Sequence, residues 1–166
     1  MWLCNSSIGR KVVMSVTGVA LILFLTFHMS MNIVALFSGD AYNMICEFLG
    51  ANWYALVATA GLAALAVLHI VYAFWLTMQN RKARGNERYA VTTRPQGVEW
   101  ASQNMLVLGI IIILGLLLHL FNFWYNMMFA ELTGIAVAHH PADGYAYIVD
   151  TFSCPVYVVL YIVWLV

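Results

Sequence analysis

Four long stretches of the sequence contain no Asp, Glu, Lys or Arg, and they restrict the chain to a membrane fold. The stretches are residues 12–39, 48–80, 100–130 and 151–166. A helix that crosses the hydrocarbon core of a bilayer needs about 20 mostly apolar residues, and the first three stretches exceed that length. The composition agrees, because 64% of the residues are hydrophobic and only 8% are charged, far fewer charges than a soluble domain carries. We therefore predict an all-α membrane protein.

The predicted architecture is a transmembrane helix bundle that forms a single membrane domain over residues 1–166. We expect helices over about 12–37, 53–79, 101–125 and 152–166. The fourth stretch holds sixteen uncharged residues, so at ~1.5 Å per residue its helix reaches only part of the way across the bilayer. A terminal carboxylate is costly in hydrocarbon. We therefore expect the fourth span to be truncated and the chain to be incomplete.

The basic residues predict the orientation of these helices. Two of them precede the first expected helix and five follow the second, whereas the other connections carry acidic residues. Basic loops stay in the cytoplasm, so the N-terminus is expected there. The net charge is zero, which gives no indication of a nucleic-acid partner. The seven basic residues are Arg10, Lys11, Arg81, Lys82, Arg84, Arg88 and Arg94.

Three histidines lie inside the expected helices, and their depths differ. From the expected membrane edges, His28 and His119 lie about sixteen or seventeen residues, or roughly 24 Å, from the cytoplasmic side. His69 lies in the inner half. A lone intramembrane histidine can simply bind a neighbouring helix, but ionisable groups at this depth are usually functional. Two imidazoles at one level suit the axial positions of a haem iron. Gly115, four residues before His119, is expected to leave room for the flat macrocycle, although small residues also mark ordinary contacts between helices.

Three segments of the chain resemble one family in order and spacing. They are "SVTGVALILFLTFHM" (15–29), "LAVLHIVYAFWLTMQNRKAR" (65–84) and "EWASQNMLVLGIIIILGLLLHL" (99–120). They are similar to helices of the di-haem cytochrome b membrane subunit of succinate:quinone oxidoreductases, which include fumarate reductases and succinate dehydrogenases. The family has five spanning helices, of which four are visible here.

The resemblance implies two haem b groups and assigns their ligands. His28 and His119 match the axial ligands of the outer haem. His69 matches one ligand of the inner haem, and its partner is expected beyond Val166. Ser15 and Trp100 match residues that contact haem propionates.

The resemblance also implies a quinone site and soluble partners. Glu47 is the nearest match to a carboxylate that accepts a proton from quinol, with a solvated loop carboxylate as the alternative. Menaquinol is the implied substrate, and iron–sulfur and flavoprotein subunits that interconvert fumarate and succinate are the implied partners. They would dock on the cytoplasmic face of a bacterial inner membrane. The basic loop 81–94 could meet one of them or lie against anionic lipid.

Other interpretations remain open at this stage. The chain could be an independent transmembrane b-type cytochrome, or a haemless transporter or anchor whose histidines bind ions or relay protons. His139 and His140 could hold a surface metal, but no second ligand pair has a standard spacing. The widely spaced Cys4, Cys46 and Cys154 are more typical of small apolar side chains than of a disulfide.

Overall fold

The computed structural model describes residues 6–50, 52–85 and 99–166, and these residues contain helices and turns but no strand. The prediction of an all-α fold is confirmed. The chain divides into two compact units, Met1–His28 with Val57–Gln103, and Met29–Leu56 with Asn104–Val166. The division falls inside two long helices, so each unit is described separately below. Cys4, Arg88 and Arg94 lie outside the described residues.

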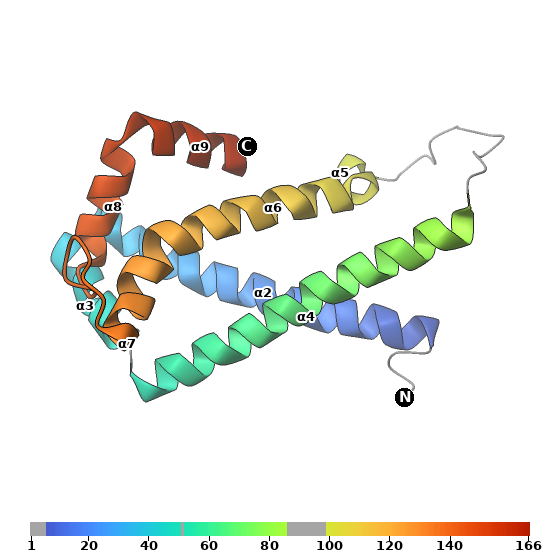
Figure 1. The fold of residues 1–166 in the computed structure, drawn as a ribbon, viewed down its shortest axis with the longest axis horizontal. Helices are drawn as coiled ribbons and strands as arrows, with labels where there is room; N and C mark the ends of the chain where they lie inside the picture. The colour runs from blue at the N-terminus through green and yellow to red at the C-terminus, as the bar shows by residue number, and fades with distance from the viewer. Residues whose placement is uncertain (1–5, 51, 86–98) are drawn as a thin grey trace. The chain divides into compact units, whose positions relative to one another are not determined.

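The first unit contains most of helix α2 (Ser7–Ile33) and helix α4 (Trp53–Arg84), with the short α5 (Trp100–Gln103). Figure 1 shows α2 crossing α4. Both helices extend beyond their expected ends at residues 12 and 79, because charged side chains can continue a helix into water. At the start of α2, the Oγ of Ser6 accepts a hydrogen bond from the N–H of Gly9 at 2.9 Å, as in an N-cap. After α4, Gly85 has a φ of +68°, which ends the helix.

The second unit contains the third expected helix, which is interrupted in its hydrogen-bonding pattern. After a turn at Asn104 come α6 (Met105–His119), a π-helical segment η2 (Leu120–Phe129) and α7 (Ala130–Thr133). A left-handed Gly134, with a φ of 69°, follows α7. The helix thus continues well past residue 125, its expected end. π-Helical segments are rare and often occur at functional sites.

A short helix that was not expected joins the first two spans. The segment η1 (Val34–Leu36) is followed by α3 (Gly39–Phe48). Ser38 caps α3 by accepting a hydrogen bond from the N–H of Ala41 at 3.2 Å, and Asp40 lies in the first turn, where a negative charge favours the helix dipole. At ten residues, α3 is too short to cross a bilayer.

The fourth expected helix, 152–166, contains a sharp bend, because it covers the last two residues of one helix and the whole of the next. Helix α8 (Gly144–Ser153) and helix α9 (Pro155–Leu165) meet at 95°. Proline has no N–H to continue a helix and pushes the residue before it out of the helical region. Cys154 accordingly has φ −89° and ψ 114°. Figure 1 shows α9 turning back along α6, and the two helices are in contact.

A polar network joins α3 to α8 in the second unit. The Nδ2 of Asn43 donates to Oδ1 of Asp143 at 2.7 Å, and the N–H of Tyr145 donates to Oδ1 of Asn43 at 2.9 Å. Asp143 also caps α8 by accepting from the N–H of Ala146 at 3.1 Å. Cys46 packs against Gly144, where an added Cβ would overlap its sulfur. Because Asn43 and Asp143 contact both helices, this network fixes how α3 and α8 pack.

Among the described residues, three helices are long and apolar enough to cross a membrane, or up to four if the bent pair α8–α9 is one span. The three are Ser7–Leu36, Trp53–Ala83 and Met105–Thr133. Most of their apolar side chains are exposed, as expected for surfaces that face lipid. The chain is a multi-pass membrane protein.

Candidate functional site

The clearest polar contact between the long helices of the first unit involves His69. Its Nδ1 lies 2.8 Å from the Oγ1 of Thr17, which joins α4 to α2. Thr17 is only 5% exposed, so its hydroxyl is shielded from water. Thr17 was not among the predicted site residues. Ser15 was predicted to contact a haem propionate, and the side chain of Ser15 is exposed.

The hydrogen bonds of Thr17 indicate the tautomer of His69. The Thr17 hydroxyl is 2.8 Å from the carbonyl oxygen of Val13 and 3.2 Å from that of Met14. Since a carbonyl can only accept, the single hydroxyl proton is directed to it. We therefore assign the Thr17 oxygen as the acceptor of a hydrogen bond from His69, which puts the proton of the neutral ring on Nδ1. The lone pair is consequently on Nε2.

The other ring nitrogen, Nε2, has no hydrogen-bond partner within residues 6–50, 52–85 and 99–166. His69 lies near the middle of α4, far from either end of that span. An unpaired polar atom is costly at this depth. The ring edge lies close to the α2 backbone, because a Cβ added at Gly18 would be 3.5 Å from Cε1. An exposed lone pair on a fixed imidazole is what a metal ligand requires.

A second contact between α2 and α4 sets their register near the basic ends of the helices. The Nη1 of Arg10 donates to Oε1 of Gln79 at 2.7 Å, and its guanidinium lies 5.3 Å from the centroid of the Trp75 ring. Stacking of arginine on tryptophan is favourable. Together with the contact between Thr17 and His69, this fixes the two helices as antiparallel neighbours, with His69 at the level of Thr17.

His28 lies on the same helix as Thr17 but at a different level. Eleven residues separate the two in sequence, so their levels differ by about 16 Å along the α2 axis. The imidazole of His28 stacks on Phe24 with ring centroids 5.5 Å apart and is half-buried. The first unit therefore carries two histidines at two well-separated levels.

His119 belongs to the second unit, where it ends α6 and directly precedes the π-helical segment η2. Its ring is 5.2 Å from that of Phe123. The recess that Gly115 was expected to leave for a macrocycle is filled instead, because an added Cβ would overlap the indole of Trp164. The bend at Pro155 turns α9 back along α6, and this brings Trp164 over Gly115. The pairing of His28 with His119 stays a prediction.

Two further residues with predicted roles lie on exposed surfaces. Trp100 begins α5 and is 62% exposed. Glu47 lies near the end of α3 with an exposed side chain, which agrees with a solvated carboxylate more than with a dry proton-accepting pocket. Glu131 is nearby, with its Oε2 3.0 Å from the Cβ position of Gly50.

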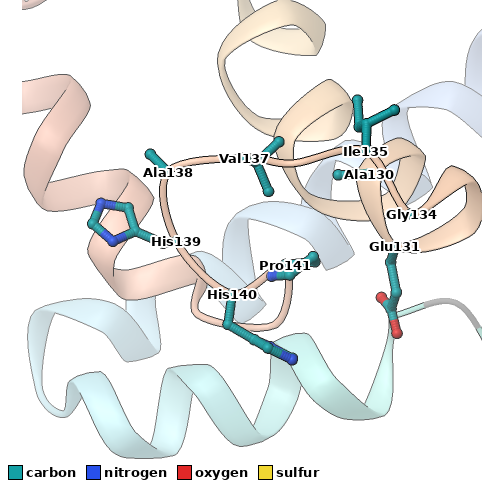
Figure 2. A pocket seen from close by; sticks show the side chains of 9 residues that line it. All are labelled: Ala130, Glu131, Gly134, Ile135, Val137, Ala138, His139, His140 and Pro141. Carbon is teal, nitrogen blue, oxygen red and sulfur yellow. The ribbon is translucent and has the colours of Figure 1, made fainter.

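The loop after α7 forms a hollow, but its histidines do not converge. Figure 2 shows the side chains of Glu131, His139 and His140 pointing in different directions. His139 bonds Asp150 through Nε2 at 2.5 Å and accepts at its carbonyl oxygen from the Tyr147 hydroxyl at 2.7 Å. In the described part of the chain, no three His, Cys, Asp or Glu side chains form a metal-binding group. The surface-metal interpretation of His139 and His140 therefore gains no support. Haem, which needs only axial ligands, is unaffected by that finding.

The described cysteines, Cys46 and Cys154, are both free thiols. This agrees with the interpretation of these residues as small apolar side chains.

No protein-family model, curated protein or solved structure matches this chain. The resemblance to cytochrome b subunits thus stays a prediction from the residues quoted above.

Proposed function

We propose that this chain is a di-haem cytochrome b membrane subunit of a succinate:quinone oxidoreductase. In this role it passes electrons between menaquinol or menaquinone in the bilayer and iron–sulfur and flavoprotein subunits that interconvert fumarate and succinate. The observation that carries the proposal is the orientation of His69. Its Nδ1 lies 2.8 Å from the Oγ1 of Thr17, and with the proton assigned to Nδ1 its Nε2 keeps a lone pair in the middle of a spanning helix.

The contacts of His69 in the first unit fit a role for this residue as a haem ligand. His69 would hold the inner haem through Nε2, and Thr17 would hold the ring. A haem bound there supplies a site that accepts and releases one electron at a time. The recess at Gly115 is filled, which does not support the space for a macrocycle predicted next to His119. The proposal of an outer haem therefore depends only on the expected depths of His28 and His119.

The separation of levels supports a role in moving charge across the membrane. His28 is about 16 Å from the level of His69 along α2, whereas the hydrocarbon core is about 30 Å thick. Two redox sites at these levels would divide that distance into steps. Glu47 stays the candidate acceptor for protons from quinol, although its exposed side chain is not the dry pocket that this role predicts.

The charge distribution supports the proposed orientation and partners. Arg81 and Lys82 at the end of α4 are exposed, near the contact of Arg10 with α4. Asp143 and Asp150 lie on the side of the chain expected outside. Because basic segments stay in the cytoplasm, the N-terminus would be cytoplasmic in a bacterial inner membrane. The partner subunits would dock at this basic end.

The test is an absorption spectrum of the protein purified from its native membrane with its accompanying subunits. We expect reduced b-type bands. Replacing His69 by Ala should remove one haem, and replacing His28 or His119 should remove the other. His140→Ala, in a loop, is the matched control and should keep both. Absence of b-type bands from the wild-type protein would overturn the proposal in favour of a haemless transporter or anchor. Haem without flavin or iron–sulfur subunits would identify an independent cytochrome instead.

A further inference from the structure

We propose that Thr17 is the positioning residue for His69: its hydroxyl accepts the Nδ1 proton, which fixes the ring tautomer and turns Nε2 toward an iron ligand position. This inference rests on the proposed function for the identity of the iron ligand. The contact itself, at 2.8 Å between Oγ1 and Nδ1, stands independently of that function.

The local geometry makes Thr17 a directional acceptor. Its proton is directed to the carbonyl oxygen of Val13, 2.8 Å away, so its oxygen presents a lone pair to α4. Threonine is β-branched and has few rotamers in a helix, and this hydrogen bond to the preceding turn selects one of them. The burial of Thr17 excludes water that would otherwise compete for the Nδ1 proton. The side chain therefore holds its acceptor in one place.

The other tautomer of His69 would break this arrangement. With the proton on Nε2, the Nδ1 lone pair would face the Thr17 oxygen, and Thr17 would have to withdraw its proton from Val13. An N–H on Nε2 would also be left without an acceptor among the described residues. The contact with Thr17 thus favours the tautomer whose Nε2 can bind a metal.

The same hydrogen bond should tune the electronic properties of the ligand. A histidine that donates its second N–H becomes a stronger base toward a metal, and a stronger donor stabilises the oxidised iron. Loss of the Thr17 acceptor should therefore move the midpoint potential of the haem at His69 to more positive values. A purely structural contact between two helices would not produce a shift confined to that haem.

Three variants separate these effects. Thr17→Val keeps the shape of the side chain and removes the acceptor, whereas Thr17→Ser keeps the hydroxyl. Thr77→Val is the matched control, because Thr77 makes the same kind of bond to the preceding turn, at 2.8 Å from Ala73, on α4 of the same unit. If Thr17→Val does not accumulate, Thr17→Ala provides the same comparison with less bulk.

The first readout is the protonation state of the two ring nitrogens of His69, measured by NMR. The purified protein is labelled with nitrogen-15 histidine and reduced for the measurement. In wild type and Thr17→Ser we expect one protonated nitrogen, Nδ1, whose proton exchanges slowly with deuterated water. In Thr17→Val or Thr17→Ala this proton should exchange faster. This measurement does not require that haem be present. Unchanged exchange in the variants without the hydroxyl would overturn the inference.

The second readout is the midpoint potential of the haem that His69→Ala removes. We expect a positive shift in Thr17→Val, recovery in Thr17→Ser and no shift in Thr77→Val. If the haem is bound but its potential is the same in all variants, the positioning role is refuted while the proposed function stands. If the wild-type protein binds no haem, the proposed function fails, and the exchange of the Nδ1 proton still decides whether Thr17 fixes the tautomer.

Discussion

A methyl group added at Gly115 tests whether α9 packs on α6 through the Trp164 indole. A Cβ at this position would overlap the ring, so Gly115→Ala forces the indole or α9 to move. Overpacking of this kind costs about 1–3 kcal/mol, and replacing glycine by alanine inside a helix returns roughly 0.5–1 kcal/mol. The overpacking term is the larger of the two. We expect the free energy of unfolding to fall by about 1 kcal/mol.

The assay is equilibrium unfolding in mixed detergent micelles, followed by circular dichroism. Gly109→Ala is the control, because it lies on the same helix and its added Cβ meets nothing within 4 Å. This variant should gain roughly 0.5–1 kcal/mol. In a protein that carries Trp164→Leu, Gly115→Ala should no longer lower the free energy of unfolding, since the two changes act on one contact. Equal stabilities for Gly115→Ala and Gly109→Ala would refute the packing described here.

Three other perturbations probe the second unit. Asn43→Ala removes the link between α3 and α8 and leaves Asp143 without that donor, so thermal melting should show a loss of about 1–3 kcal/mol. Burial raises the pKa of the Cys46 thiol above its usual value, so unfolding should become easier as the pH rises above 9.0, the ordinary value, where the unfolded chain loses this proton first. Asp150→Asn weakens an exposed ion pair with His139, and its melting should change by less than about 1 kcal/mol.

Each of these results has a clear contrary outcome. An Asn43→Ala variant as stable as wild type would show that the network does not hold α3 to α8. The pH effect should diminish in Cys46→Ala, and an unchanged pH profile in that variant would assign the effect to other groups. A large loss in Asp150→Asn would mean that the loop after α7 depends on this pair far more than its exposure suggests.

The long helices could be predicted from the sequence because hydrophobicity alone defines a span. Their ends could not, since the charged residues that bound the apolar stretches, such as Arg10 and Arg81, still belong to α2 and α4. Helix α3 was not predicted either, because its ten residues are too few for a span. Pro155 was a visible signal of the bend between α8 and α9, but the apolar run around it predicted one continuous helix.

The surroundings of the histidines were not predictable from the sequence. Their depths in the membrane stay predictions, and the contact between His69 and Thr17 shows only which levels of α4 and α2 meet. Thr17 itself could have been found by matching the antiparallel helices residue by residue, since it is a polar side chain opposite His69. The indole over Gly115 follows from the bend at Pro155, and no local pattern near Gly115 indicates it.

The length of the α2 segment between Thr17 and His28 sets the distance along the helix axis between the levels of His69 and His28. Because one continuous helix carries both positions, substitutions in neighbouring helices leave their spacing unchanged. An inserted residue would instead lengthen the interval by ~1.5 Å and swing His28 by about 100° around the axis. The spacing of the two imidazole levels therefore depends on the number of these ten intervening residues more than on most of their side chains.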